Sequence, residues 1–157
     1  MLFRSGPENL RVESLEVPPP GRGEVRLRQT ACGLNYIDVY DRSGLYPAPL
    51  PLTLGREAAG VVEALGPGVR GLRVGDRVAY VASAPGAYAT VRNAPARLMV
   101  PLPATIDDAV AAGLMLKGLT AWYLLRRTFP VRKGHEVVVH AAAGGVGLLL
   151  VQWARAL

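Results

Sequence analysis

Glycines near the end of the sequence are spaced for contact with phosphate groups. In the segment 142–147, Gly144 and Gly147 occupy the second and third positions of the pattern G-x-G-x-x-G, and Ala142 occupies the first. The second glycine of that pattern lets the backbone approach a pyrophosphate, and the third lets a helix pack closely on a strand. Amide groups at the start of such a helix face the phosphates. The spacing predicts a dinucleotide-binding turn, although a strand-to-helix turn can also contain glycines for geometry alone.

The residues on either side of this turn favour a strand and a helix. Residues 136–139 are a short β-branched run typical of a buried parallel strand, and residues 148–155 are good helix formers. Before them we predict two helices, one from the acidic pair 107–108 to about residue 112, and one over 119–127. A strand, a glycine turn and a helix form the first unit of a doubly wound sheet.

The earlier part of the sequence is rich in proline, glycine and short apolar runs. Turn signals such as Gly66-Pro67-Gly68 separate strand-like runs, which occur at 24–28, 58–65, 75–81 and 87–91. Short strands at this spacing predict a partly open β-barrel. The predicted fold class is therefore α/β with a β-rich N-terminal part. We expect a barrel domain over residues 1–103 and the beginning of a nucleotide-binding domain over residues 104–157.

The composition is that of a folded protein without a membrane segment or a nucleic-acid surface. Half of the residues are hydrophobic and 19% are charged. The formal charge of +6 comes from arginines scattered along the sequence, with no basic stripe of interleaved aromatics, so we do not expect a nucleic acid as partner. Residues 137–154 carry no charged side chain, but His140 and glycines interrupt them, and we expect no transmembrane helix.

The cysteine and the histidines form no recognisable catalytic pair. Cys32 is the only cysteine, so it cannot form an internal disulfide, and this indicates a reducing compartment, the cytoplasm. Free cysteine is usually a core residue, and we expect Cys32 to be buried at a strand end. His140 lies beside the glycine turn, where it either contacts a cofactor or serves a structural role.

Several motifs, in order, resemble those of the medium-chain dehydrogenase/reductase superfamily over essentially the whole chain. They are GLNYID at 33–38, GREAAGVV at 55–62, GDRV at 75–78 and the glycine turn. Within the superfamily, the segments 35–46 and 117–125 resemble the zinc-free quinone oxidoreductase branch, which is related to zeta-crystallin. The resemblance implies a chaperonin-10-like, partly open β-barrel followed by the first units of a Rossmann-type doubly wound sheet, which is incomplete here.

The resemblance also implies that a further half of the protein follows. In the family, that half supplies the remaining strands of the sheet and the last segment of the catalytic domain, and the full-length protein forms a homodimer. We expect the 157-residue chain to be a fragment, marginally stable and inactive on its own. The 136–139 strand would then have an exposed edge, and the last helix an uncovered apolar face.

The motifs depart from those of the zinc-containing members of the superfamily. The resemblance places Asn35 where the first cysteine ligand stands in those members, Arg56 in place of the histidine of their GHE motif, and Leu116 near the third ligand position. A catalytic zinc site needs three good protein ligands, and an arginine among them repels the ion. The four-cysteine structural zinc lobe cannot form with one cysteine. We therefore expect no metal.

The resemblance implies hydride transfer from NADPH to a quinone or a related conjugated carbonyl. Gly144 to Gly147 would cradle the pyrophosphate, Lys117 would reach phosphate or ribose, and Thr120 would bind the nicotinamide carboxamide. The residues that choose between NADPH and NADH lie beyond Leu157. Matched residue by residue, the expected cofactor-binding set is Asn35, Tyr36, Ile37, Asp38, Tyr40, Lys117, Thr120, Tyr123, Gly144, Gly145, Val146 and Gly147.

Three residues of the early motif carry specific expectations. Tyr40 and Tyr46 are the candidate catalytic residues, expected to line the acceptor pocket, where a phenolic hydroxyl donates a hydrogen bond to the developing oxyanion. Tyrosines near glycine and proline turns also pack without a chemical role, and both interpretations stay open. Asp38 is equally well explained as a cofactor contact and as a cap or turn residue.

Two alternatives change the function. Metal-free enoyl reductases, including those of fatty-acid and polyketide synthases, are close relatives that deliver hydride to an alkene conjugated to a thioester, and these residues do not separate the two acceptors. A non-catalytic structural or RNA-binding role, as in crystallin-like relatives, is the alternative of another class. The glycine turn and the matching segments around Asn35 and Lys117 favour an enzyme.

Overall fold

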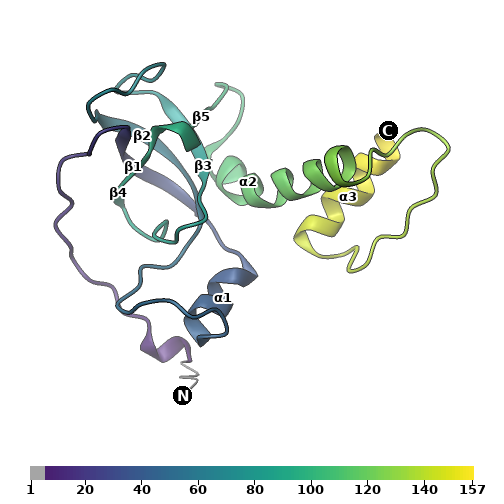
Figure 1. Ribbon diagram of the computed structural model, residues 1–157, viewed down its shortest axis with the longest axis horizontal. Coiled ribbons are helices and arrows are strands. Elements are labelled where there is room, and N and C mark those ends of the chain that lie inside the picture. Colours follow the sequence, from purple (N-terminus) through teal and green to yellow (C-terminus); the bar gives the residue numbers. More distant parts are fainter. Residues whose placement is uncertain (1–5) are drawn as a thin grey trace. The chain divides into compact units, whose positions relative to one another are not determined.

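The computed structural model describes residues 6–157, which form two compact units. The first unit ends at Gly113 and the second comprises Leu114–Leu157. Helix α2 (Asp108–Tyr123) begins in the first unit and ends in the second. Figure 1 shows the sheet of the first unit and the two helical segments of the second.

The first unit is built on one antiparallel sheet, with the strand order β4-β1-β2-β3-β5. Its strands are β1 (Glu24–Gly33), β2 (Glu57–Leu65), β3 (Arg77–Val81), β4 (Val91–Pro95) and β5 (Val100–Pro101). The long strands β1 and β2 pair along their lengths, and Gly33 stands opposite Glu57 at one end. Two register shifts between them increase the local twist and help the sheet to curl. The predicted β-rich N-terminal part is confirmed.

The core of the first unit lies on one face of this curled sheet. Side chains alternate between the faces of a strand, so residues two apart along β1 and β3 share the inner face. Fully buried side chains there include Val25, Leu27, Val62, Val78 and Tyr80. The buried Tyr80 hydroxyl donates a hydrogen bond to Gln29 Oε1 at 2.6 Å, which satisfies its polar atom inside the core.

One predicted strand is wrong in its position. The sequence predicts a strand at 87–91, whereas β4 begins at Val91. The backbone N–H groups of Ala87 and Tyr88 donate to carbonyl groups of the loop 54–55, at 3.0 and 2.8 Å. These two N–H groups bind a loop instead of a neighbouring strand. The alternating sequence pattern that predicts a strand contains no information about that loop.

The helical prediction needs a correction. Instead of two helices over 107–112 and 119–127, one helix, α2, runs from Asp108 to Tyr123 and continues as a π-helical turn, η3 (Leu124–Thr128). Gly113 and Gly118 each cost about 1 kcal/mol in a helix interior, but the leucine, methionine and lysine between them are good helix formers. The remaining helical elements are η1 (Pro7–Asn9), α1 (Tyr36–Ser43), η2 (Ala96–Leu98) and α3 (Gly145–Ala156).

The expected strand at 136–139 does not form in the described residues. This segment has no regular secondary structure; residues 136–138 are exposed, Val138 to 87%, and Val139 is half-buried. A parallel strand needs hydrogen-bonding neighbours in its own sheet, and residues 6–157 place none beside it. The glycine turn and α3 do follow it as predicted. None of the helices formed by residues 6–157 has the length and apolar character needed to cross a bilayer.

The start of α2 is tied to the sheet through the carboxylate of Asp108. Its Oδ2 accepts a hydrogen bond from the Thr30 hydroxyl of β1 at 2.6 Å, and its Oδ1 accepts one from Arg77 Nη2 of β3 at 2.5 Å. These donors favour the ionised form and lower the pKa of Asp108 below its ordinary value of 3.8. The network fixes the start of α2 on the sheet.

We predict that replacing Asp108 by asparagine weakens folding mainly at neutral pH. A lowered pKa means that the carboxylate stabilises the fold above its unfolded-state pKa, and that this stabilisation is lost as the pH falls through the lowered value. Because the pair is partly exposed, Asp108→Asn should lower the free energy of unfolding by about 1 kcal/mol at pH 7 and by less at pH 3. Urea unfolding at both pH values measures this. Glu16→Gln, at an exposed position, is the control, and equal losses at both pH values would contradict the prediction.

Candidate functional site

The predicted glycine turn is closed by its own backbone and leads directly into α3. Gly144 N–H donates to the carbonyl of Ala141 at 2.8 Å, and Ala141 has a φ of 52°, a left-handed conformation that is uncommon for alanine. Gly144 is the N-cap of α3, and no side chain caps that helix start. The first-turn amide groups of α3, which have no acceptor within the helix, therefore face out of the turn.

Two glycines of this turn make close contacts. A Cβ at Gly147 would overlap the carbonyl oxygen of Ala141, so only glycine lets the helix lie this close to the turn. A Cβ at Gly145 would lie 2.9 Å from Cδ and 3.0 Å from Cε of Lys117. The aliphatic stem of Lys117 therefore crosses the turn at Gly145. The structure brings together two motifs that the sequence analysis linked only by resemblance.

The other predicted residues of α2 lie on the same helix as Lys117. The Thr120 hydroxyl donates to the carbonyl of Leu116 at 2.7 Å, so its proton is used within the helix while its oxygen remains an acceptor. Tyr123 ends α2 and is 46% exposed. Their expected contacts with a cofactor stay predictions.

In the first unit, Asn35 and Asp38 hold the start of α1. They form a capping box, in which Asp38 Oδ2 accepts the backbone N–H of Asn35 at 2.9 Å. The same oxygen accepts the Tyr88 hydroxyl at 2.8 Å. The Asn35 side-chain amide donates to Oε1 of the fully buried Glu57 at 2.7 Å. Both residues therefore have structural partners. Their role in cofactor binding would come in addition and stays a prediction.

Tyr88 and Glu57 are members of this cluster that sequence reasoning did not single out as functional. Burial and the neighbouring carboxylate of Asp38 raise the pKa of Tyr88, so its phenol stays protonated and donates to Asp38. Tyr88 is 50 residues from Asp38 in the sequence, and nothing local marks the contact. Glu57 lies inside the GREAAGVV motif, and that position is the sequence signal that could have marked it as a functional residue.

A buried ion pair holds the C-terminal half of α1. Arg56 Nη2 lies 2.7 Å from Asp41 Oδ2, and the two side chains are 16% and 2% exposed. Arg56 Nε donates to the same oxygen at 3.2 Å, and Nη1 donates to the carbonyl of Ser83. The guanidinium that stands in place of the GHE histidine is thus bound to a carboxylate and a backbone carbonyl. Within residues 6–157, no group of three His, Cys, Asp or Glu side chains is placed to hold a metal ion.

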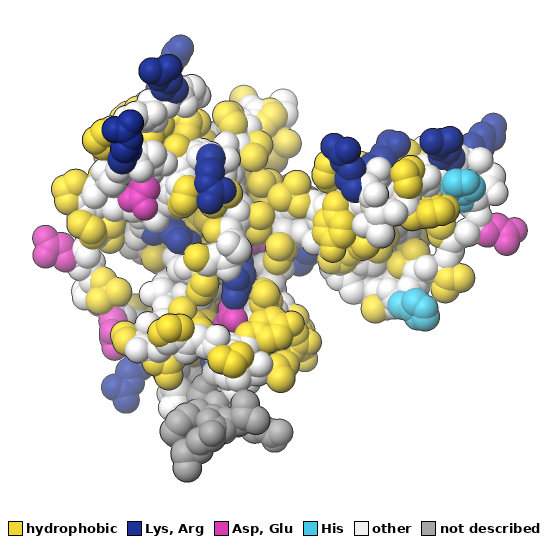
Figure 2. All heavy atoms as spheres, in the orientation of Figure 1, with side chains coloured by type: hydrophobic (Ala, Val, Ile, Leu, Met, Phe, Trp, Pro, Cys, Tyr) yellow, Lys and Arg dark blue, Asp and Glu magenta, His cyan; other side chains and the backbone are white. Residues whose placement is uncertain are grey.

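Three tyrosines form a ladder along α1 and the loop that follows it. The Tyr36 and Tyr40 rings are 5.3 Å apart and the Tyr40 and Tyr46 rings 5.4 Å apart, both edge to face. Tyr36 is 73% exposed and Tyr46 is 48% exposed. Figure 2 shows hydrophobic side chains gathered over the end of the first unit that carries α1. The two predicted catalytic tyrosines are therefore neighbours; Tyr46 is exposed and Tyr40, the middle ring of the ladder, is half-buried.

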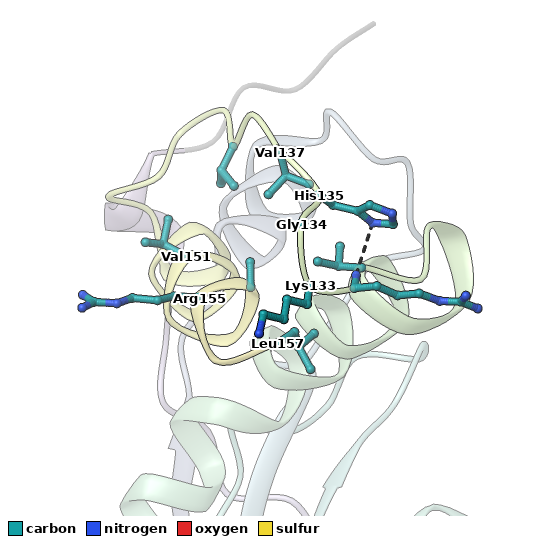
Figure 3. A pocket seen from close by; sticks show the side chains of 11 residues that line it. Lys133, Gly134, His135, Val137, Val151, Arg155 and Leu157 are labelled. Carbon is teal, nitrogen blue, oxygen red and sulfur yellow. Dashed lines mark hydrogen bonds between the residues drawn. The ribbon is translucent and has the colours of Figure 1, made fainter.

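Two further features are Cys32, which lies beside Tyr88, and a hollow in the second unit. Cys32 is exposed, so its predicted burial is wrong. The end of β1 runs beside the loop that contains Ala87, and the Cys32 thiol donates to the carbonyl of Ala87 at 3.0 Å. Within the second unit, a hollow of about 420 Å³ lies between the 131–139 segment and the last turns of α3 (Figure 3). The glycine turn does not line it, and its His135 Nδ1 accepts the backbone N–H of Arg132 at 3.2 Å.

Comparison with known proteins places the chain in a family. The model of the alcohol dehydrogenase GroES-like domain matches residues 21–104. The chain belongs to this family. Its membership of the medium-chain dehydrogenase/reductase superfamily, predicted from the motifs, is thereby confirmed.

Individual relatives agree with the predicted branch. A quinone oxidoreductase from Pseudomonas aeruginosa is 53% identical over 97% of this chain and 47% of its own length. A 2-haloacrylate reductase from a Burkholderia species is 47% identical over 97% of this chain and 47% of its own length. The crystal structure of Escherichia coli quinone oxidoreductase complexed with NADPH matches with a TM-score of 0.94 and 48% identity, over 98% of this chain and 48% of that chain. The chain spans about half the length of these relatives.

We predict that the Arg56–Asp41 pair is a major contribution to the stability of the first unit. Arg56→Met leaves the Asp41 carboxylate buried without its partner, which should cost about 3 kcal/mol of unfolding free energy. Arg28→Met is the matched control, because the Arg28–Glu63 pair is 54% and 38% exposed and should contribute less than about 1 kcal/mol. Chemical denaturation of both variants measures the difference. Equal losses in the two variants would contradict the prediction.

Proposed function

We propose that the protein containing this sequence is an NADPH-dependent reductase that transfers hydride to a quinone or a related conjugated carbonyl without a metal. The glycine turn carries the proposal. Its helix start has no side-chain cap, Gly147 packs against Ala141, and the Lys117 stem crosses Gly145. Two relatives named above are quinone oxidoreductases, and one was solved with NADPH. They support both the cofactor and the acceptor.

The residues of the turn fit a dinucleotide. The free amides at the start of α3 would donate hydrogen bonds to a pyrophosphate, and the positive end of the helix dipole favours the same charge. The Lys117 ammonium would add a positive charge at the turn. We propose that Gly144, Gly145, Val146, Gly147, Lys117, Thr120 and Tyr123 of the second unit and Asn35, Tyr36, Ile37, Asp38 and Tyr40 of the first contact the cofactor. When bound, NADPH supplies the hydride.

The tyrosine ladder suits an aromatic or conjugated acceptor. We propose that the rings of Tyr40 and Tyr46 bind a planar acceptor and that one hydroxyl donates a hydrogen bond to its developing oxyanion. A quinone is electron-poor and accepts hydride without a Lewis acid, which agrees with the donor set around Arg56. There, Arg56 is bound to Asp41 and Asn35 to Glu57, and by resemblance these two residues stand where zinc-containing members of the superfamily have ligands.

The domain boundary and the assembly belong to the same proposal. We propose that the catalytic domain ends near residue 103 and that the nucleotide-binding domain begins at 104, which the family match ending at residue 104 supports. A homodimer in the cytoplasm is the expected form of the protein, by resemblance and from its single cysteine.

A reductase of activated alkenes is the second candidate. The relative named 2-haloacrylate reductase supports it, since that name implies an alkene conjugated to a carboxylate. Parallel assays of NADPH oxidation with a quinone, with a 2-haloacrylate and with an enoyl thioester distinguish the acceptors. The assays use the protein expressed from the full reading frame that contains this sequence. A kcat/KM for the quinone at least tenfold above the other two supports the first candidate.

We predict that Gly147→Ala weakens NADPH binding. The added methyl overlaps the Ala141 carbonyl, so the turn must move away from α3, and NADPH affinity should fall by about tenfold or more. Gly118→Ala is the matched control, because a Cβ there meets nothing within 4 Å, and it should leave affinity unchanged. Titration calorimetry gives Kd, and the NADPH-induced rise in Tm gives an independent measure. Identical affinities in both variants would contradict the assigned pyrophosphate site.

We predict that Tyr40→Phe and Tyr46→Phe affect turnover more than cofactor binding. Each change removes a hydroxyl and keeps the ring, so the edge-to-face ladder persists. If a hydroxyl stabilises the oxyanion, kcat with a quinone should fall by about tenfold or more in at least one variant. The NADPH Kd of Tyr46→Phe is the internal control and should stay unchanged, because Tyr46 is outside the proposed set of cofactor contacts. Unchanged kcat in both variants would leave the tyrosines a packing role only.

A further inference from the structure

Three arginines that are far apart in the sequence line one hollow of the first unit. Arg22 precedes β1, Arg70 follows β2, and Arg97 lies in η2. The hollow measures about 590 Å³, and its other lining residues are Gly23, Glu24, Gly68, Val69, Pro95 and Ala96. The linear sequence shows these arginines only as scattered charges, and the fold brings them to one end of the barrel. Figure 2 shows dark-blue basic side chains at the end of this unit where Figure 1 shows the turn after β2.

The backbone under this hollow is fixed by hydrogen bonds between its three segments. Gly23 N–H donates to the carbonyl of Pro67 at 2.9 Å, and Gly66 N–H donates to the carbonyl of Glu24 at 2.8 Å. Ala96 N–H donates to the carbonyl of Gly23 at 2.8 Å. Each segment carries one of the arginines, so the attachment points of the three guanidinium groups are held in a fixed arrangement. The backbone therefore needs no rearrangement on binding, and the entropic cost is that of ordering the three exposed side chains.

The charge of the hollow is positive and is not neutralised by the fold. Arg22, Arg70 and Arg97 are all exposed, and within residues 6–157 no ion pair joins any of them to an acidic side chain. Glu24 is the acidic residue of the lining, and its Oε2 accepts the backbone N–H of Gly21 at 2.9 Å. Up to three guanidinium groups, each with several N–H donors, therefore remain available to one ligand.

We propose that this hollow, which we call the arginine hollow, binds a small molecule that carries two or more phosphate groups. One guanidinium group can donate two parallel hydrogen bonds to two oxygens of the same phosphate group. A halide ion cannot accept hydrogen bonds in this geometry, so an arginine site favours phosphate. The volume is in the range of small-molecule sites. No aromatic residue lines the hollow, so it offers no stacking surface for bases of a single-stranded nucleic acid. The residues differ from those of the glycine turn, and the proposal does not depend on the reductase function.

Inorganic pyrophosphate is the probe for a first test on the full chain. Backbone amide NMR at low salt should show saturable shifts of residues 22–24, 68–70 and 96–97. The glycine turn at 144–147 reports separately on the cofactor site, so failure of one site does not hide the other. Absence of saturable shifts at the arginine hollow overturns the proposal, whatever happens at the glycine turn.

Two single variants that remove the same charge provide the decisive comparison. Arg70→Gln should weaken pyrophosphate binding at the hollow at least tenfold. Arg73→Gln, three residues away, exposed and outside the lining, should change it less than twofold. Equal weakening in both variants means general charge attraction and overturns the site. A single-stranded RNA of about ten nucleotides is the second ligand; tighter binding of RNA than of pyrophosphate, with shifts spread beyond the hollow, also overturns the small-molecule proposal.

Discussion

The first unit depends on the requirement that the buried carboxyl group of Glu57 be hydrogen-bonded. Glu57 is fully buried at the start of β2, where an unpaired carboxyl group would cost several kcal/mol. Asn35, the residue before α1, provides a donor. Gly33 allows the approach, because a Cβ there would overlap both Glu57 Oε1 and the carbonyl oxygen of Ala112 in α2. Glu57 therefore fixes the start of α1 on β2, and Gly33 lets the end of β1 lie close to both Glu57 and α2.

The three α-helices begin in two different ways, and the difference bears on function. Asp107 Oδ1 accepts the N–H of Ala109 at 2.8 Å at the start of α2, and α1 begins with the Asn35–Asp38 capping box. Helix α3 begins at Gly144 with no side-chain cap. A helix start that only had to be stable would gain about 1 kcal/mol from a capping side chain. Glycine there keeps the amides accessible, which a binding site for a phosphate group requires.

Features that depend on neighbouring residues could be predicted from the sequence. Features that depend on a partner far away in the sequence could not. The glycine turn was found because its backbone closure, from Gly144 N–H to the Ala141 carbonyl, spans three residues. The contact between Tyr88 and Asp38 spans 50 residues, and no periodicity or motif encodes it. The strand expected at 136–139 had the right composition, but composition cannot supply the neighbouring strand that pairing needs. Family resemblance marked residues such as Arg56 without revealing their partners.

The ion pair of Arg56 and Asp41 connects the structural and the chemical parts of the first unit. Asp41 lies on the helix that carries Tyr40, one residue away, so the guanidinium holds the orientation of the ladder as well as the stability of the fold. A hydroxyl that assists hydride transfer must be placed within a few tenths of an ångström of the reacting oxygen, and a helix held at only one end would not achieve this. The capping box fixes one end of α1 and the ion pair fixes the other. Arg56 therefore holds the helix that carries Tyr40, through a contact with Asp41 that the sequence motif alone does not reveal.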